Sequence, residues 1–144
     1  MLTLPQPIAA QIHAHAERDY PHECCGVLLG SFANGRWSIA AALPAANSEA
    51  QSPQNRYSID ARELVRIHRE AARQGLDIAG FYHSHPDHPA MWSPTDLAEA
   101  HWLGCLYLIT ELRAGKAVTT NAFLLAGNSE EEKHFLPVAI EPTS

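Results

Sequence analysis

The segment HSHPDHPAMWSPTD, residues 83–96, gathers side chains that could bind a metal ion. One residue separates His83 from His85, and Ser93 and Asp96 follow after a short loop. Two neutral imidazoles and one carboxylate, with a fourth position open to water, form the ligand set of a catalytic zinc site. The alternative is a polar loop that happens to be rich in histidine, and the segment alone does not decide between the two.

The spacing of the two histidines fits a strand. Side chains two residues apart in a strand point to the same face, so the imidazoles would lie about 6–7 Å apart along it and could converge on one ion. Ala79 and Phe81 precede them at the same spacing, which predicts an inner, partly dry face. Pro86 follows at once and should end the strand, so we expect His85 at its tip.

Ser93 and Asp96 have two explanations. The sequence SPTD is a good helix start, with Ser93 as N-cap, Pro94 in the first turn and Asp96 reaching back to the cap. Taken alone, this capping explanation is the simpler one. However, a loop of seven residues also returns Asp96 toward the end of the histidine strand, where its carboxylate is a candidate third metal ligand.

A zinc hydrolase also needs a proton acceptor outside the ligand set. Metal-bound water has a pKa of about 7, and a carboxylate must take its proton and pass it to the leaving amine. Glu23 is the candidate, because it stands directly before the apolar segment CCGVLLG, where an acidic residue is otherwise unneeded. The plain alternative for a lone glutamate at a strand edge is solvation.

Length and composition set the class of protein. The chain has 144 residues, 46% of them hydrophobic, so we expect one domain, 1–144, with its own core. Its net charge of −6 argues against a nucleic-acid partner, and its one basic run predicts a solvated helix face. This run consists of Arg62, Arg66, Arg69 and Arg73.

The cysteines and apolar segments bear on location. Cys24, Cys25 and Cys105 are an odd set with no disulfide framework, which favours a reducing cytoplasm. The N-terminus lacks the charged and apolar regions of a signal peptide. No apolar run approaches the length that spans a bilayer, so no membrane association is expected.

Hydrophobic periodicity and turn signals predict an α/β fold with a partly antiparallel sheet and helices packed against it. Asn34-Gly35 predicts a hairpin turn, and Asp60, Glu63 and Gly75 predict a helix with a capping box and a glycine stop. The expected elements are helices over 7–19, 60–75 and 93–104, strands over 24–32, 36–43, 76–85, 105–110, 117–125 and 133–140, and a surface loop over 44–56.

Together these residues resemble a known family. Glu23, the pair His83-x-His85-Pro86, and Ser93-x-x-Asp96 at their spacings resemble the JAMM motif of MPN-domain metalloproteases. The opening HECCGVLLG and the segment RYSIDARELVRIHREAARQGLDIAGFYHSHP are similar to the compact bacterial members, so the resemblance covers nearly the whole chain. It implies a single MPN-type domain with a mixed, largely antiparallel sheet and flanking helices, distantly like cytidine deaminase.

The resemblance also implies roles. His83, His85 and Asp96 would bind one zinc ion, with water as the fourth ligand, and Glu23 would be the general base and proton shuttle. Ser93 would hydrogen-bond the water or the oxyanion, which is compatible with capping because a hydroxyl is both donor and acceptor. Cys25 is expected to be a small buried residue, with a modulatory thiol as the alternative. His88 should be exposed.

The implied activity is that of a zinc-dependent peptidase or isopeptidase. Its implied partner is a small ubiquitin-like or sulfur-carrier protein of the ThiS/MoaD type that ends in Gly-Gly. The tail of such a carrier could add as a strand along a sheet edge leading to the zinc ion. The loops over 44–56 and 86–92 are expected to contact it, with Trp92 either an exposed anchor or a packed lid.

Three other functions compete with this one. A non-catalytic MPN scaffold would have lost the metal ligands, whereas all five motif positions are intact here. A zinc deaminase needs a Cys-x-x-Cys pair, which the three cysteines cannot form. A peptidase of cell-wall or phage material shares the motif, but the missing signal peptide argues weakly against it.

Overall fold

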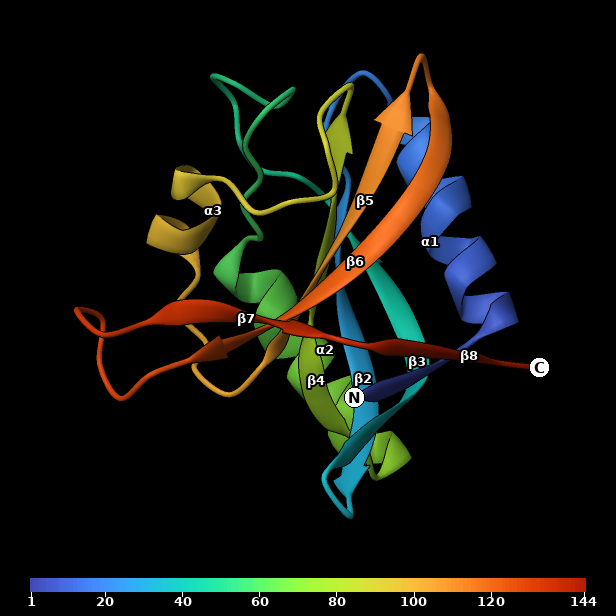
Figure 1. Ribbon diagram of the computed structural model, residues 1–144, viewed down its shortest axis with the longest axis vertical. Coiled ribbons are helices and arrows are strands. Elements are labelled where there is room, and N and C mark those ends of the chain that lie inside the picture. Colours follow the sequence, from blue (N-terminus) through green and yellow to red (C-terminus); the bar gives the residue numbers. More distant parts are fainter.

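Eight strands form one mixed sheet at the centre of the molecule (Figure 1). The computed structural model describes residues 1–144. The strand order is β7-β6-β5-β4-β2-β3-β1-β8; β4–β5, β1–β3 and β1–β8 are parallel pairs and the others antiparallel. The bounds are β1 Leu2–Pro5, β2 Cys25–Ala33, β3 Arg36–Ala45, β4 Asp77–Pro86, β5 Leu106–Arg113, β6 Lys116–Ala126, β7 His134–Val138 and β8 Ile140–Thr143.

Helices cover both faces of the sheet and create two cores. Helix α1, Gln6–Asp19, packs its Ile12 against one face, and helix α2, Ala61–Gln74, packs its Ile67 against the other. Helix α3, Pro94–Glu99, lies on the α2 side, as Figure 1 shows. Neighbouring residues of a strand divide between the two cores: Leu28 belongs to the α1 side and Val27 to the α2 side. No helix is long and apolar enough to cross a membrane.

Local sequence signals placed most elements correctly. Asn34 and Gly35 have positive φ in the turn between β2 and β3, and Gly75 ends α2 at φ 68°. The Asp60 side chain caps α2 by accepting from the Arg62 N–H. The predicted capping box is wrong, however, because Glu63 accepts a hydrogen bond from the Ala46 N–H of the preceding loop instead.

Two predicted elements differ most from the structure. Helix α3 ends at Glu99 rather than near Gly104, because Ala100 turns extended and Trp102 packs its ring on Phe81, 5.1 Å between centroids. The expected final strand 133–140 is divided at Ala139 into β7 and β8, which pair at opposite edges of the sheet. Figure 1 shows this red C-terminal segment crossing the molecule from one edge to the other.

Strand β1 was missed, and one strand face was misplaced. Strand β1 has four residues and ends at Pro5, so it is too short to show a hydrophobic period. It nevertheless buries Leu2 and Leu4 between β3 and β8. In β4, a bulge leaves Ala79 unpaired between Ile78 and Gly80, so Ala79 belongs to the α1 side and not to the face of Phe81.

Candidate metal centre and its surroundings

The C-terminal end of β4 and the start of α3 bring three candidate ligands together. His83 and His85 are both buried on the α2 side, with their Nε2 atoms 3.2 Å apart. Asp96 Oδ1 lies 3.3 Å from His83 Nε2, and Asp96 Oδ2 lies 3.0 Å from His85 Nε2. The chain contains no other group of three such side chains with ligand atoms this close.

These distances fit a small tetrahedral cation. Nitrogen and oxygen atoms bound at about 2.0–2.1 Å to a tetrahedral ion lie roughly 3.3 Å from one another. The three ligand atoms of His83, His85 and Asp96 are separated by that amount and face one another. The predicted ligand set is therefore assembled as a metal site requires.

Hydrogen bonds orient His85 for this task. Its Nδ1 lies 2.8 Å from the Pro89 carbonyl oxygen, so Nδ1 carries the hydrogen and Nε2 keeps its lone pair for a ligand. The next residue, Ala90, is held at both ends: its N–H donates to Glu111 Oε1, and its carbonyl accepts from Asn121 Nδ2. Side chains of β5 and β6 thereby fix the loop that holds His85.

His83 is held by packing. The ring of Tyr57 stacks on it, 4.5 Å between centroids, and its Nδ1 has no hydrogen-bond partner. Burial lowers the pKa of His83, which favours the neutral form that binds metals. Burial alone would raise the pKa of Asp96, but hydrogen bonds with His83 and His85 outweigh it and hold that pKa below its usual range.

Ser93 and Asp96 also form the predicted cap of α3. Ser93 Oγ accepts from the Asp96 N–H, and Asp96 Oδ2 accepts from the Ser93 N–H. The cap does not use the hydroxyl hydrogen of Ser93, so Ser93 can donate it to a group in the adjoining cavity. Capping and metal binding are thus not alternatives here, because one carboxylate is placed for both.

Glu23 lies beside these ligands. Cys25 pairs with His83 across β2 and β4, and Cys24 with Ser84 through the Ser84 N–H; continued by one residue, this register places Glu23 opposite His85. Glu23 is buried, and its Oε1 has no hydrogen-bond partner. Burial first, then the charges of Asp96 and Glu99, raise the pKa of Glu23 to about 9.

The loop between β3 and α2 fixes the backbone of Glu23, a contact that no local sequence pattern predicts. The Glu23 N–H donates to the Pro53 carbonyl, and the Glu23 carbonyl accepts from Asn47 Nδ2. Asn47 also donates to the Arg56 carbonyl and accepts from the Ser58 N–H. A single asparagine therefore ties Glu23 to the loop that carries Tyr57 over His83.

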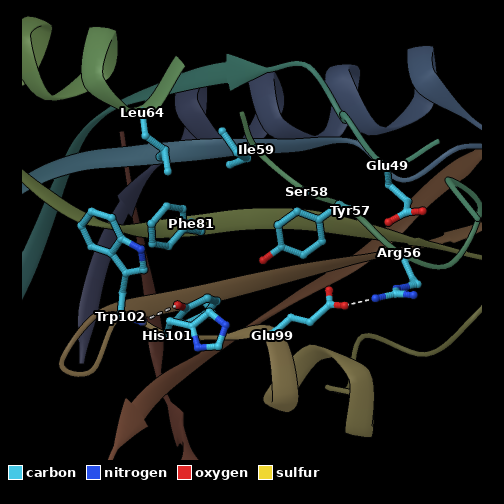
Figure 2. Close-up of a pocket in the computed structure, with 11 residues that line it drawn as sticks. Glu49, Arg56, Tyr57, Ser58, Ile59, Leu64, Phe81, Glu99, His101 and Trp102 are labelled. Atoms are coloured by element: carbon cyan, nitrogen blue, oxygen red, sulfur yellow. Dashed lines mark hydrogen bonds and ion pairs between the residues drawn. The ribbon is translucent and has the colours of Figure 1, made fainter. Parts of the chain in front are cut away.

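Two cavities adjoin the centre. The first, about 580 Å³, is lined by Glu23, His85 and Ser93, together with residues of both predicted contact loops. The second, about 400 Å³, has an apolar base that includes Phe81 and Trp102 (Figure 2). Arg56 lines both cavities, and its ion pair with Glu99 joins the loop to α3 between them (Figure 2).

The remaining candidates lie outside the ligand set. Cys24 and Cys25 are buried free thiols, and burial raises the pKa of Cys24 to about 12 and that of Cys25 still further, so neither is a ready nucleophile. His88 is exposed, as predicted. Trp92 is half-buried with its ring 5.6 Å from that of Phe135, which makes it a packed side chain rather than an exposed anchor.

The fold and this site define a class: α/β proteins that bind a metal ion at the end of a central strand beside a buried glutamate. The family model for prokaryotic homologs of the JAB domain matches residues 5–126. The chain belongs to this family of JAB/MPN-like domains.

Two named relatives support this family assignment. The chain is 38% identical over 112 residues to the desampylase of Haloferax volcanii, covering 75% of this chain and 78% of that protein. It is 32% identical over 102 residues to the probable TtuB-protein conjugate cleaving protease of Thermus thermophilus, covering 71% and 65%. The second relative is named as a protease, and this chain is a protease of the same family.

The fold itself has close structural neighbours. A solution structure of a Desulfitobacterium hafniense protein superposes with a TM-score of 0.81 at 28% identity, covering 99% of this chain and 94% of the other. A solution structure from Salinibacter ruber gives 0.72 at 37% identity, covering 98% and 92%.

Proposed function

We propose that this chain is a zinc-dependent peptidase or isopeptidase that cuts at the C-terminal tail of a ubiquitin-like or sulfur-carrier protein. The observation that carries the proposal is the assembly of His83, His85 and Asp96 beside the unpaired carboxyl oxygen of Glu23. The names of the two relatives, a desampylase and a TtuB-protein conjugate cleaving protease, support a ubiquitin-like conjugate as the class of substrate.

In this proposal, His83, His85 and Asp96 hold the zinc ion. When bound, zinc polarises the scissile carbonyl and makes water acidic near neutral pH. Nitrogen and carboxylate ligands fit zinc among the common divalent metals. The neutral state of His83 and the charged state of Asp96, both favoured by their surroundings, are the states that binding needs.

Glu23 moves the proton and Ser93 steadies the oxyanion. The carboxylate of Glu23 takes a proton from the attacking water and gives it to the leaving nitrogen. Without a metal, the pKa of Glu23 is raised to about 9, so the group holds a proton; the positive charge of a bound zinc ion would favour the carboxylate that accepts one. Ser93 has its hydroxyl hydrogen available for the developing negative charge.

The tail of the substrate needs an open backbone edge, and the sheet offers none at the site. Strand β4 is paired on both sides, by β2 and β5, and the free edges of the sheet are at β7 and β8. In the loop beside the site, Ser58 uses its N–H and carbonyl within the protein, whereas those of Tyr57 and Ile59 have no protein partner. We place the extended tail along these two residues.

Location and organisation complete the proposal. Three free cysteines, two of them buried, suit a reducing cytoplasm. The single sheet that runs from β1 to β8 supports one domain over 1–144.

The decisive experiment is Glu23→Gln. The substrate is a ThiS/MoaD-type carrier extended by several residues beyond Gly-Gly, and mass spectrometry follows the product. We expect zinc content equal to that of the parent and a loss of turnover of about 10²–10⁴-fold, because the ligands remain while the proton acceptor is gone. Equal rates for parent and variant would refute the role of Glu23, and an intact tail after incubation with the zinc-loaded parent would refute the substrate class.

A further inference from the structure

Four arginines form a stripe along the outer face of α2. Arg62, Arg66, Arg69 and Arg73 are all exposed and recur every three or four residues, so they share one face of the helix. Together with Val65 and Glu70 they line a shallow hollow. The stripe holds four of the ten basic residues of a chain whose net charge is −6.

Helix stability does not explain this arginine stripe. Arg62 and Arg66 are like charges four residues apart, as are Arg69 and Arg73, and such pairs weaken a helix. Arg73 pairs with Glu70, and Arg66 lies 4.0 Å from Glu63. The guanidinium groups of Arg62 and Arg69 have no carboxylate partner. Two uncompensated positive charges are thus displayed on an otherwise acidic molecule.

The stripe starts where the proposed tail path ends. The open backbone groups of Tyr57 and Ile59 precede the cap residue Asp60, and Arg62 lies in the first turn of α2. Leu64, which follows closely in α2, lines the second cavity beside Ile59, and Tyr57 lines the same cavity (Figure 2). A protein whose tail passes Ile59 toward the metal centre would therefore have its folded body beside the outer face of α2.

We propose that the arginine stripe docks an acidic face of the carrier's folded body while the carrier's tail occupies the site; this inference rests on the proposed function. The stripe is about 16 Å long, at 1.5 Å per residue from Arg62 to Arg73. A carrier of roughly 80 residues has a diameter of about 30 Å, so one face of it covers the stripe. Exposed Val65 at its centre adds an apolar contact.

A protein partner fits this surface better than a nucleic acid. Glu63 and Glu70 interrupt the stripe. Their carboxylates would repel a phosphate backbone, whereas a protein surface that carries both signs of charge can accommodate them. The remainder of the molecule is acidic, whereas nucleic-acid binders carry a broad positive field. The carboxylates of an acidic protein face can instead pair individually with Arg62 and Arg69.

The test compares a whole carrier with its tail alone. The variant is Arg62→Glu/Arg69→Glu in the zinc-loaded protein, which breaks no ion pair and places an acidic residue in the first turn, where it is tolerated. The substrates are the extended acidic carrier and a synthetic peptide of its tail. We expect kcat/KM for the carrier to fall about tenfold at low salt, through KM, because charges at an interface rim govern association. Peptide cleavage should stay within about twofold, since the peptide lacks the acidic face.

The matched control is Arg18→Glu/Lys116→Glu, which changes the net charge equally on other parts of the surface. The proposal is overturned if the control loses as much as the stripe variant, if the stripe variant keeps the parent's KM for the carrier, or if peptide cleavage falls equally. If the parent cleaves neither substrate, the proposed function fails. In that case, the binding of the carrier to parent and variant tests the docking role of the arginine stripe by itself. Equal dissociation constants would overturn that role. Tighter binding of a single-stranded RNA, lost in the variant, would also overturn it.

Discussion

At the scale of single residues, each candidate ligand is held by an interaction that leaves its ligand atom free. His85 uses Nδ1 on the Pro89 carbonyl and keeps Nε2 for the centre. Asp96 anchors Oδ2 on the Ser93 N–H, and the ring of His83 is fixed by stacking on Tyr57. Such supports reduce the ordering cost when a metal binds, because the ligands already converge.

Removing a ligand tests the assignment directly. We expect His85→Ala and Asp96→Ala to lose both bound zinc and activity, because a site with two protein ligands holds the ion poorly. Asp96→Ala should also lower the free energy of unfolding by about 1 kcal/mol, since it removes half of the capping box. Zinc content after dialysis and denaturant unfolding measure the two effects. His88→Ala, in the same loop but exposed, is the control, and full zinc retention in both ligand variants would contradict the assignment.

The convergence of the candidate ligands could be predicted from sequence, but their supports could not. The spacing of His83 and His85 is a property of one strand, and Ser93 and Asp96 form a local cap, so short-range rules reach them. Asn47 and Tyr57 act across 24 or more residues of chain, on Glu23 and His83. No periodicity encodes such contacts, since they exist only after the loop folds over the sheet.

At the scale of elements, α3 is unusual because none of its six residues is fully buried, although Leu97 packs partly against the α2-side core. Polar contacts also hold it. At its C-terminal end, Lys133 Nζ donates to the carbonyls of Ala98 and Ala100, and this ammonium group is largely buried. A cation at a helix C-terminus is also favoured by the helix dipole. Lys133 thus positions the helix that carries Asp96.

We therefore expect Lys133→Met to weaken metal binding by about 10–100-fold, the usual effect of losing a residue that supports a ligand. Methionine fills a similar volume but cannot donate to the two carbonyls, so α3 loses its C-terminal anchor. Competition with a chromophoric chelator measures zinc affinity independently of activity. Lys116→Met, at the exposed start of β6, is the control. Zinc affinity equal to that of the parent would show that α3 is held without Lys133.

Element prediction failed where the partner was distant. The segment 133–140 reads as one continuous apolar pattern, and only its pairing with two distant strands divides it between β6 and β1. The end of α3 likewise depends on Trp102 meeting Phe81, far from any local stop signal. In contrast, α2 was predicted to within a residue because Asp60 and Gly75 are local signals.

At the scale of the whole molecule, the two faces of the sheet have separate polar networks. The α2 side holds the metal centre, and the α1 side holds His15, whose Nδ1 lies 2.8 Å from the Tyr82 hydroxyl and whose Nε2 lies 3.2 Å from Asp19. Tyr82 and His83 are adjacent in β4 and point to opposite faces. Stability and chemistry can therefore be probed on different sides of one strand.

Burial lowers the pKa of His15 below its ordinary value of 6.5, although Asp19 opposes the shift. The folded protein then binds fewer protons than the unfolded chain below about pH 6.5, so the free energy of unfolding must fall as the pH drops from 6.5 toward the lowered value, and it is fully recovered above 6.5. Burial also lowers the pKa of His83, which adds to this pH dependence in the metal-free protein.

Urea unfolding in the presence of a chelator tests this. The free energy of unfolding should fall less between pH 7.5 and 5.5 for His15→Gln than for the parent, while the exposed control His22→Gln should match the parent. An unchanged slope in His15→Gln would mean that the buried imidazole on the α1 face is not what makes the fold acid-sensitive.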